Sequence, residues 1–168
     1  GQAGAWADYD NAGDLDVFLS NVGANALYRN DGGTEFVNIA ADAGVRQSGS
    51  GWLTTAAGWA DYNGDGYLDL YLASGGDEQF QPDLLFAGNV SGIFADSTSS
   101  AGLPTSVTAQ LSAGWADFDN NGSPDLYATN GFGPFGPGNR LFRNNRSADR
   151  FLRVLVRGKG PTANGANL

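Results

Sequence analysis

The chain has 168 residues, enough for one domain of ordinary size, and 41% of them are hydrophobic. The net charge of −9 argues against a nucleic-acid partner, and no apolar run approaches the roughly 20 residues of a membrane-spanning helix. The absence of cysteine and histidine excludes disulfides, thiol nucleophiles, cysteine zinc sites and imidazole acid–base chemistry.

An aromatic segment, a cluster of aspartates and an apolar run follow one another three times along the chain. The copies read WADYDNAGDLDVFL from Trp6, WADYNGDGYLDLYL from Trp59 and WADFDNNGSPDLYA from Trp115. Their first aspartates are residues 8, 61 and 117, so the period is near 55 residues, which is typical of propellers and solenoid arrays. Ten of the 18 acidic residues lie inside these copies, whereas a merely solubilising surface would scatter them.

Each repeat predicts several short strands rather than helices. Apolar and other residues alternate over 15–19 and 68–72, and glycine clusters at 30–34 and 74–77 separate the strands. The best helical candidates are short turns at 40–44 and 97–102. We therefore expect an all-β fold of β-propeller-type blades, in three repeats over about 1–50, 51–107 and 108–145, with about four antiparallel strands each.

Three repeats do not make a ring, because propellers typically close with about four to eight blades. The ring is then either incomplete or completed by association. Both open blade faces should be apolar, which favours self-association or further blades in a longer parent protein. The chain opens inside a repeat, so we expect it to be a piece of a longer protein, and the lack of a leader pattern does not bear on export.

The aspartate clusters are candidate metal-binding loops. When each loop is numbered from its first aspartate, acceptor side chains recur at positions 1, 3 and 9, glycine recurs at position 6, and position 7 varies as expected of a backbone-carbonyl ligand. The candidate ligands are Asp8, Asp10, Asp14 and Asp16 in the first loop, Asp61, Asn63, Asp65, Tyr67 and Asp69 in the second, and Asp117, Asp119, Asn121, Ser123 and Asp125 in the third.

Calcium suits these loops better than the alternatives do. Hard cations take six to eight oxygens from flexible loops, whereas magnesium demands a tight octahedron and keeps its waters. Asp, Asn and Gly also favour metal-free turns, but three loops in one register favour a metal. An EF-hand would need glutamate at position 12, where this chain has Leu19, Leu72 and Ala128. We expect up to three Ca2+ ions, one per repeat.

The first loop departs from the other two at position 5, where Ala12 replaces an acceptor side chain. This site is expected to recruit a water or to bind more weakly, with the charge of Asp14 as partial compensation.

The pattern D-x-[DN]-x-[DN]-G-x-x-D between two strands, repeated at this spacing, resembles the FG-GAP/VCBS repeat. The resemblance covers about residues 3–145 and implies integrin-α-like propeller blades that bind calcium between their first two strands. The tail at 146–168 resembles the start of an ASPIC/UnbV segment, because LRVLVRG at 152–158 matches its first strand approximately.

The pattern therefore predicts a calcium-binding propeller module of an extracellular, cell-surface or periplasmic protein, with a structural, adhesive or ligand-interaction role. Whether its ligand is a protein or a carbohydrate is left open. The alternative is a calcium-dependent carbohydrate-active enzyme, a lyase or hydrolase, or its carbohydrate-binding module. That alternative needs a carboxylate outside the loops, such as Asp77, Glu78 or Asp83, in a pocket beside an arginine or lysine.

The tryptophans and arginines carry separate expectations. The three tryptophans that precede the loops should pack inside or between blades, whereas Trp52 is the better candidate for a surface contact. Arg29, Arg140 and Arg143 should pair with local carboxylates or carbonyls.

Overall fold

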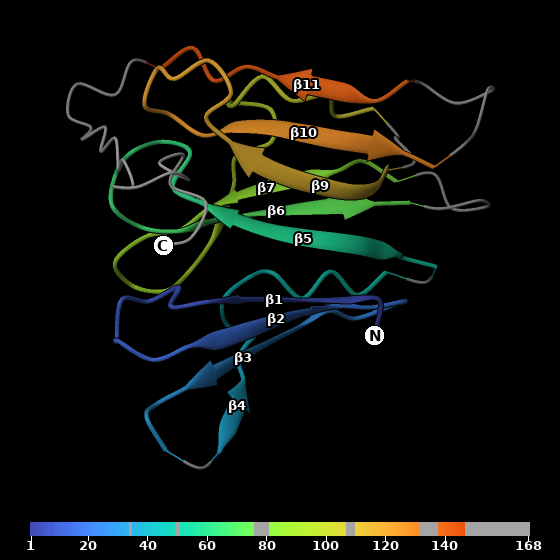
Figure 1. Cartoon of the computed structure of the whole chain (residues 1–168). Coiled ribbons are helices and arrows are strands. Elements are labelled where there is room, and N and C mark those ends of the chain that lie inside the picture. The colour runs from blue at the N-terminus through green and yellow to red at the C-terminus, as the bar shows by residue number, and fades with distance from the viewer. Residues whose placement is uncertain (34, 50, 76–80, 107–109, 132–137, 147–168) are drawn as a thin grey trace, which may run out of the picture.

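The computed structural model describes residues 1–33, 35–49, 51–75, 81–106, 110–131 and 138–146. These residues form three antiparallel sheets that lie side by side as the blades of an unclosed propeller (Figure 1). The all-β class and the blade architecture predicted from the sequence are confirmed. No helix in the described part of the chain is long and apolar enough to cross a membrane.

The first blade contains four strands in sequential order. They are β1 (Ala3–Ala7), β2 (Asp16–Ser20), β3 (Ala26–Asn30) and β4 (Phe36–Asn38). The aspartate loop joins β1 to β2, so the metal-loop pattern and the first hairpin of the blade coincide.

The other two blades repeat this plan. The second contains β5 (Thr54–Ala60), β6 (Asp69–Ser74), β7 (Leu84–Ala87) and β8 (Ala95–Asp96). The third contains β9 (Gln110–Ala116), β10 (Asp125–Asn130) and β11 (Arg140–Phe142) within the described residues. Its expected last strand, and all but the first residue of the ASPIC/UnbV-like tail, lie outside them. The segments at 40–44 and 97–102 are hydrogen-bonded turns, as expected.

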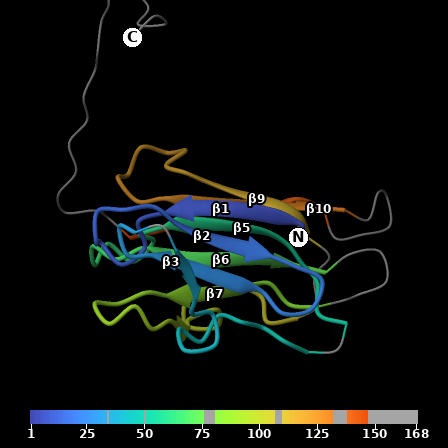
Figure 2. The same cartoon turned by 90° about the horizontal axis from the view of Figure 1, so that it is seen from below.

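The hydrophobic core lies between the blades rather than within one sheet. Residues alternate between the two faces of a strand, so the second blade turns one apolar row toward the first blade and another toward the third. Phe18 and Leu27 of the first blade pack with Leu70 and Phe86 of the second. Figure 2 shows the first two sheets overlapping along the stack.

The repeat tryptophans do not all behave alike. Trp59 and Trp115 are partly buried against the preceding blade, so the prediction of interblade packing is confirmed for both. Trp6 has no described blade before it: it contacts Phe36 of its own blade edge to face, and 60% of its surface stays exposed. The surface assignment of Trp52 is wrong: its ring packs on the first core and its Nε1 donates to Thr54 Oγ1.

Candidate metal centres

Each aspartate loop is held by side-chain acceptors that bind its own backbone. Both oxygens of the position-1 aspartate accept amides of positions 5 and 6, for example from Asp65 and Gly66 to Asp61 at 3.0 and 2.9 Å. Position 3 accepts the position-5 amide as well. The first and third loops make the same bonds. The side chains that the sequence predicts as metal ligands therefore also stabilise the turn, through hydrogen bonds to its backbone.

Two positions in each loop adopt a left-handed backbone. Position 6 is glycine with φ of 95°, 89° and 91° in the three loops, as the sharp reversal requires. Position 4 is left-handed too, at Asn11 (59°), Gly64 (69°) and Asn120 (60°). The left-handed backbone at position 4 was not predicted from the sequence, although Asn and Gly are the residues that tolerate this conformation best.

The position-9 aspartate ties the loop to the far end of the sheet. Asp16, Asp69 and Asp125 are all buried, at 1%, 0% and 1% exposure. One oxygen of each accepts the amide of loop position 2. The other accepts the amide just after or at the end of the third strand, from Asn30, Gly88 and Asn144 at 2.8, 2.9 and 2.7 Å.

These third-strand partners were not identified from the sequence. A signal existed, because the motif N-x-L-aromatic-R-N ends on Asn30 and Asn144, but nothing in the letters says that their amides meet an aspartate 14 or 19 residues away.

Carboxylates converge in the first and third loops. One oxygen from each of Asp8, Asp10 and Asp16 lies within 4.8 Å of the others, and the same holds for Asp117, Asp119 and Asp125. The second loop has Asn63 at position 3, whose amide donates to Asp65. It keeps the backbone frame of the others while carrying a neutral acceptor at that position.

Position 5 distinguishes the loops. In the second and third loops its side chain accepts the amide of position 7, from Tyr67 to Asp65 at 2.9 Å and from Ser123 to Asn121 at 2.8 Å. Ala12 offers no such acceptor. Close by, Oδ1 of Asp14 is buried and has no hydrogen-bond partner. Asp14 is not among the carboxylates that converge in the first loop, so its expected compensation for Ala12 stays a prediction.

Electrostatics favour a positive ion at the buried carboxylates. Burial raises the pKa of Asp69 to about 6, opposed by its two backbone hydrogen bonds and reinforced by the charges of Asp65 and Asp61. Burial also raises the pKa of Asp16. Because oxygens that accept one amide retain further lone pairs, these carboxylates can bind a hard cation without leaving the backbone. The donor set therefore fits Ca2+.

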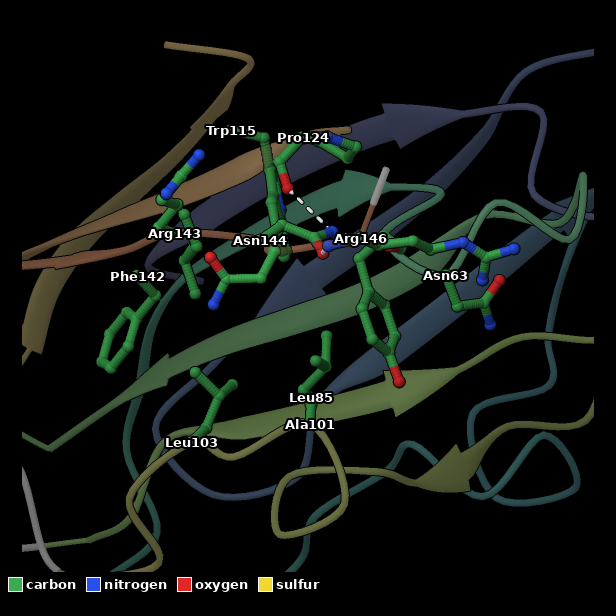
Figure 3. A pocket seen from close by; sticks show the side chains of 13 residues that line it. Asn63, Leu85, Ala101, Leu103, Trp115, Pro124, Phe142, Arg143, Asn144 and Arg146 are labelled. Carbon is green, nitrogen blue, oxygen red and sulfur yellow. Dashed lines mark hydrogen bonds between the residues drawn. The ribbon is translucent and has the colours of Figure 1, made fainter. Parts of the chain in front are cut away.

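The arginines act locally. Arg29 pairs with Asp31 and Arg143 pairs with Asp119, as expected. The guanidinium of Arg146 lies beside the second loop, where a Cβ on Gly64 would come within 3.4 Å of it. Arg143 and Arg146 border a groove of about 360 Å3 between the second and third blades. Trp115, Leu85 and Leu103 form part of its wall (Figure 3).

The carboxylates that would indicate an enzyme give no support for one. Asp77 and Glu78 lie outside the described residues. Asp83 is 6% exposed and accepts the amide of Ser74 at 2.9 Å. It does not line the groove beside the arginines, whose described wall contains no acidic side chain.

The fold and the loops define a β-propeller repeat module. A model of the FG-GAP-like repeat matches residues 8–72 and 61–128, so both matches run from one aspartate loop through the next. Together they span more than half of the chain, which therefore belongs to the FG-GAP-like repeat family. No curated protein matches the chain.

Proposed function

We propose that this chain is a calcium-binding propeller module, with one Ca2+ in each of its three aspartate loops. The convergence of three carboxylates in the first and third loops carries the proposal. Each cluster sits on a buried aspartate that is already anchored by two backbone amides. Repulsion among such charges amounts to roughly 3 kcal/mol per pair at about 5 Å and an effective dielectric near 20, and a divalent ion reverses its sign.

Calcium would serve structure rather than a reaction. The candidate ligands are the aspartate and asparagine side chains at positions 1, 3, 5 and 9 of the three loops, together with the carbonyls of Asp14, Tyr67 and Ser123 at position 7. A bound ion supplies positive charge that holds the first hairpin of each blade. Side-chain acceptors within each loop hold its backbone in place, and the position-9 aspartate links the loop to the third strand.

The setting proposed for the module is an exported, cell-surface or periplasmic protein, where it has a structural, adhesive or ligand-interaction role. Membership of the FG-GAP-like family supports this setting, since such repeats are typical of extracellular proteins. Millimolar external calcium would keep sites of ordinary affinity filled. The tail at 146–168 is proposed to lead into an ASPIC/UnbV-like segment.

Calorimetric titration of the metal-free protein with CaCl2 tests the proposal. We expect three ions per chain, with the first loop binding most weakly because Ala12 lacks an acceptor. Asp117→Asn should remove or weaken one ion, and Ala12→Asp should strengthen the weakest site.

Ala41→Asp is the matched control for the added charge, because Ala41 is exposed in a turn outside the loops. It should leave all three affinities unchanged. No heat of binding with millimolar CaCl2, or equal strengthening by both alanine variants, would contradict the metal assignment.

A further inference from the structure

One asparagine joins the aspartate loops of the second and third blades. Asn144 follows β11 and lies in the wall of the groove between these two blades (Figure 3). Its backbone amide donates to Asp125 at 2.7 Å, and its side-chain amide donates to the carbonyl of Tyr62 at 2.8 Å. Asp125 is at position 9 of the third loop and Tyr62 is at position 2 of the second. Asn144 therefore forms a bridge between two candidate metal loops.

The bridge continues to the buried carboxylate of the second loop. The carbonyl of Tyr62 accepts from Asn144, and the amide of the same residue donates to Asp69 at 2.9 Å. Asp69 and Asp125, at the two ends of this series, are at most 1% exposed. Contiguous hydrogen bonds in a buried setting strengthen one another and can carry coupling between sites. A shift of either aspartate therefore disturbs the bonds that hold the other.

The third loop holds the bridge at several points. Asn121 at position 5 donates its side-chain amide to the carbonyl of Asn144 at 2.9 Å, and Asn144 donates to the carbonyl of Pro124 at 3.3 Å. The hydroxyl of Ser123 at position 7 donates to the carbonyl of Arg146 at 2.8 Å. Candidate ligands at positions 5, 7 and 9 thus contact this short segment, so its placement depends on how those ligands are arranged.

The junction between the first and second blades is built differently. The residue equivalent to Asn144 is Gly88, which has no side chain to reach the first loop. A Cβ there would lie 2.2 Å from the carbonyl oxygen of Leu68, so the backbone leaves no room for one. Among the described contacts, a hydrogen bond of 3.3 Å from Asn11 to the carbonyl of Gly66 joins these two loops. That bond does not include either position-9 aspartate.

We propose that Asn144 couples calcium binding in the second and third loops, so that occupancy of either loop raises the affinity of the other, while the first loop is not part of this coupling. The proposal rests on the calcium assignment made above. When the third loop binds its ion, Asp125 and Asn121 become fixed, and Asn144 then holds the carbonyl of Tyr62 in place. The second loop loses less conformational freedom on binding as a result.

Site-resolved calcium titration measures this coupling. The amides of Gly66 and Gly122 donate to the position-1 aspartates of the second and third loops, so their NMR signals in the 15N-labelled chain report the two sites separately. Asp117→Asn removes the position-1 carboxylate of the third loop and should weaken calcium binding at the second loop at least about fivefold. Because coupling is reciprocal, Asp61→Asn should weaken binding at the third loop by the same additional factor.

Asn144→Ala tests the bridge itself, because it removes the side-chain amide and keeps the backbone amide that donates to Asp125. In this background Asp117→Asn should change the second-loop affinity by less than about twofold. Asn30→Ala is the matched control, since Asn30 holds the equivalent place in the first blade and makes the same local bond, to the carbonyl of Leu15. It should leave the fivefold effect intact.

The first loop shows whether the effect is specific, and the amide of Gly13 reports its affinity. Asp117→Asn should leave this affinity unchanged. The second blade forms with Gly88 at the bridge position, so Asn144→Ala should keep its fold, which circular dichroism checks.

Equal weakening of the first and second loops by Asp117→Asn would indicate coupling through the whole fold and would overturn the proposal. A second loop that does not respond, or that responds equally in Asn144→Ala, would also overturn it. In these cases calcium still binds and the metal assignment stands. The absence of any calcium-dependent shift in all three glycine signals would refute both the coupling and the metal assignment.

Discussion

At the scale of single residues, the position-9 aspartate has two roles. It accepts two backbone amides from distant segments, and it contributes negative charge to the cluster. Asp69 shows the consequence most clearly, because full burial of this residue raises its pKa to about 6. Its charged form is therefore disfavoured in the metal-free fold.

This shift predicts a pH dependence with a defined sign. Between the ordinary carboxyl value of 3.8 and about 6, the folded metal-free protein holds the Asp69 proton more tightly than the unfolded chain does. The Asp69 contribution to stability is therefore fully present below pH 3.8 and is lost as the pH rises through 6. Melting temperatures of wild type and Asp69→Asn in chelator, from pH 4 to 7, should converge or cross as the wild type loses this contribution.

Asp31→Asn is the control for this pH series, because Asp31 is an exposed aspartate that pairs with Arg29 outside the clusters. Its melting curve should follow the wild type in parallel over the upper half of the range. A constant difference between wild type and Asp69→Asn at every pH would show that the shift is wrong.

Individual loop positions show how far the sequence alone could go. The acceptors at positions 1, 3 and 9 and the glycine at position 6 were recognisable because three copies repeat them. The left-handed residue at position 4 was missed, since Asn and Gly there read as ordinary turn composition. Which amides each aspartate accepts could not be predicted, because Asn30, Gly88 and Asn144 approach the loops only when the sheet has formed.

At the scale of elements, the third strand of the second blade passes very close to its aspartate loop. The amide of Gly88 donates to Asp69, and a Cβ on Gly88 would lie 2.2 Å from the carbonyl oxygen of Leu68. Both atoms of that clash belong to fixed backbone positions, so neither can rotate away. The first and third blades have asparagine at the corresponding position, so the glycine is particular to this blade.

Gly88→Ala should therefore destabilise the chain by about 3 kcal/mol or more, at the upper end of what overpacking usually costs. Urea unfolding measures the change. Gly114→Ala serves as the matched control, because its Cβ meets nothing within 4 Å and Ala5 occupies the equivalent position of the first blade. A cost for Gly88→Ala no larger than that of the control would refute the close approach.

The arrangement of the blades also explains where the tryptophan predictions differ from the structure. A fixed place in the repeat correctly indicated interblade packing for Trp59 and Trp115. The repeat pattern could not indicate that the tryptophan of one blade packs on the blade before it. The first tryptophan therefore has no described blade to pack on and is largely exposed. Trp52 falls outside the repeat, but its position between two blades lets its ring join the first core.

At the scale of the whole molecule, calcium would supply a large share of the stability. A ligand at about 100 times its dissociation constant adds about 2.7 kcal/mol per site, so three sites add roughly 8 kcal/mol. This is comparable with the 5–15 kcal/mol that stabilises an ordinary domain. Three bound ions would also bring the net charge from −9 to −3, since each adds two positive charges.

A chelator should consequently lower the melting temperature by more than about 10 °C, as followed by circular dichroism. Excess CaCl2 should restore it, whereas added NaCl of equal ionic strength should restore much less, because screening cannot replace ions bound inside the loops. An identical melt with and without chelator would contradict a structural role for calcium.

The repetition of one junction has a consequence for how such genes change. Every blade carries a tryptophan edge on one side and an aromatic row on the other, in one register. A duplication of one blade length, near 55 residues, would produce a segment that already fits both of its new neighbours. A gain or loss of one whole repeat would therefore keep the same register of aromatic contacts at the junctions on either side.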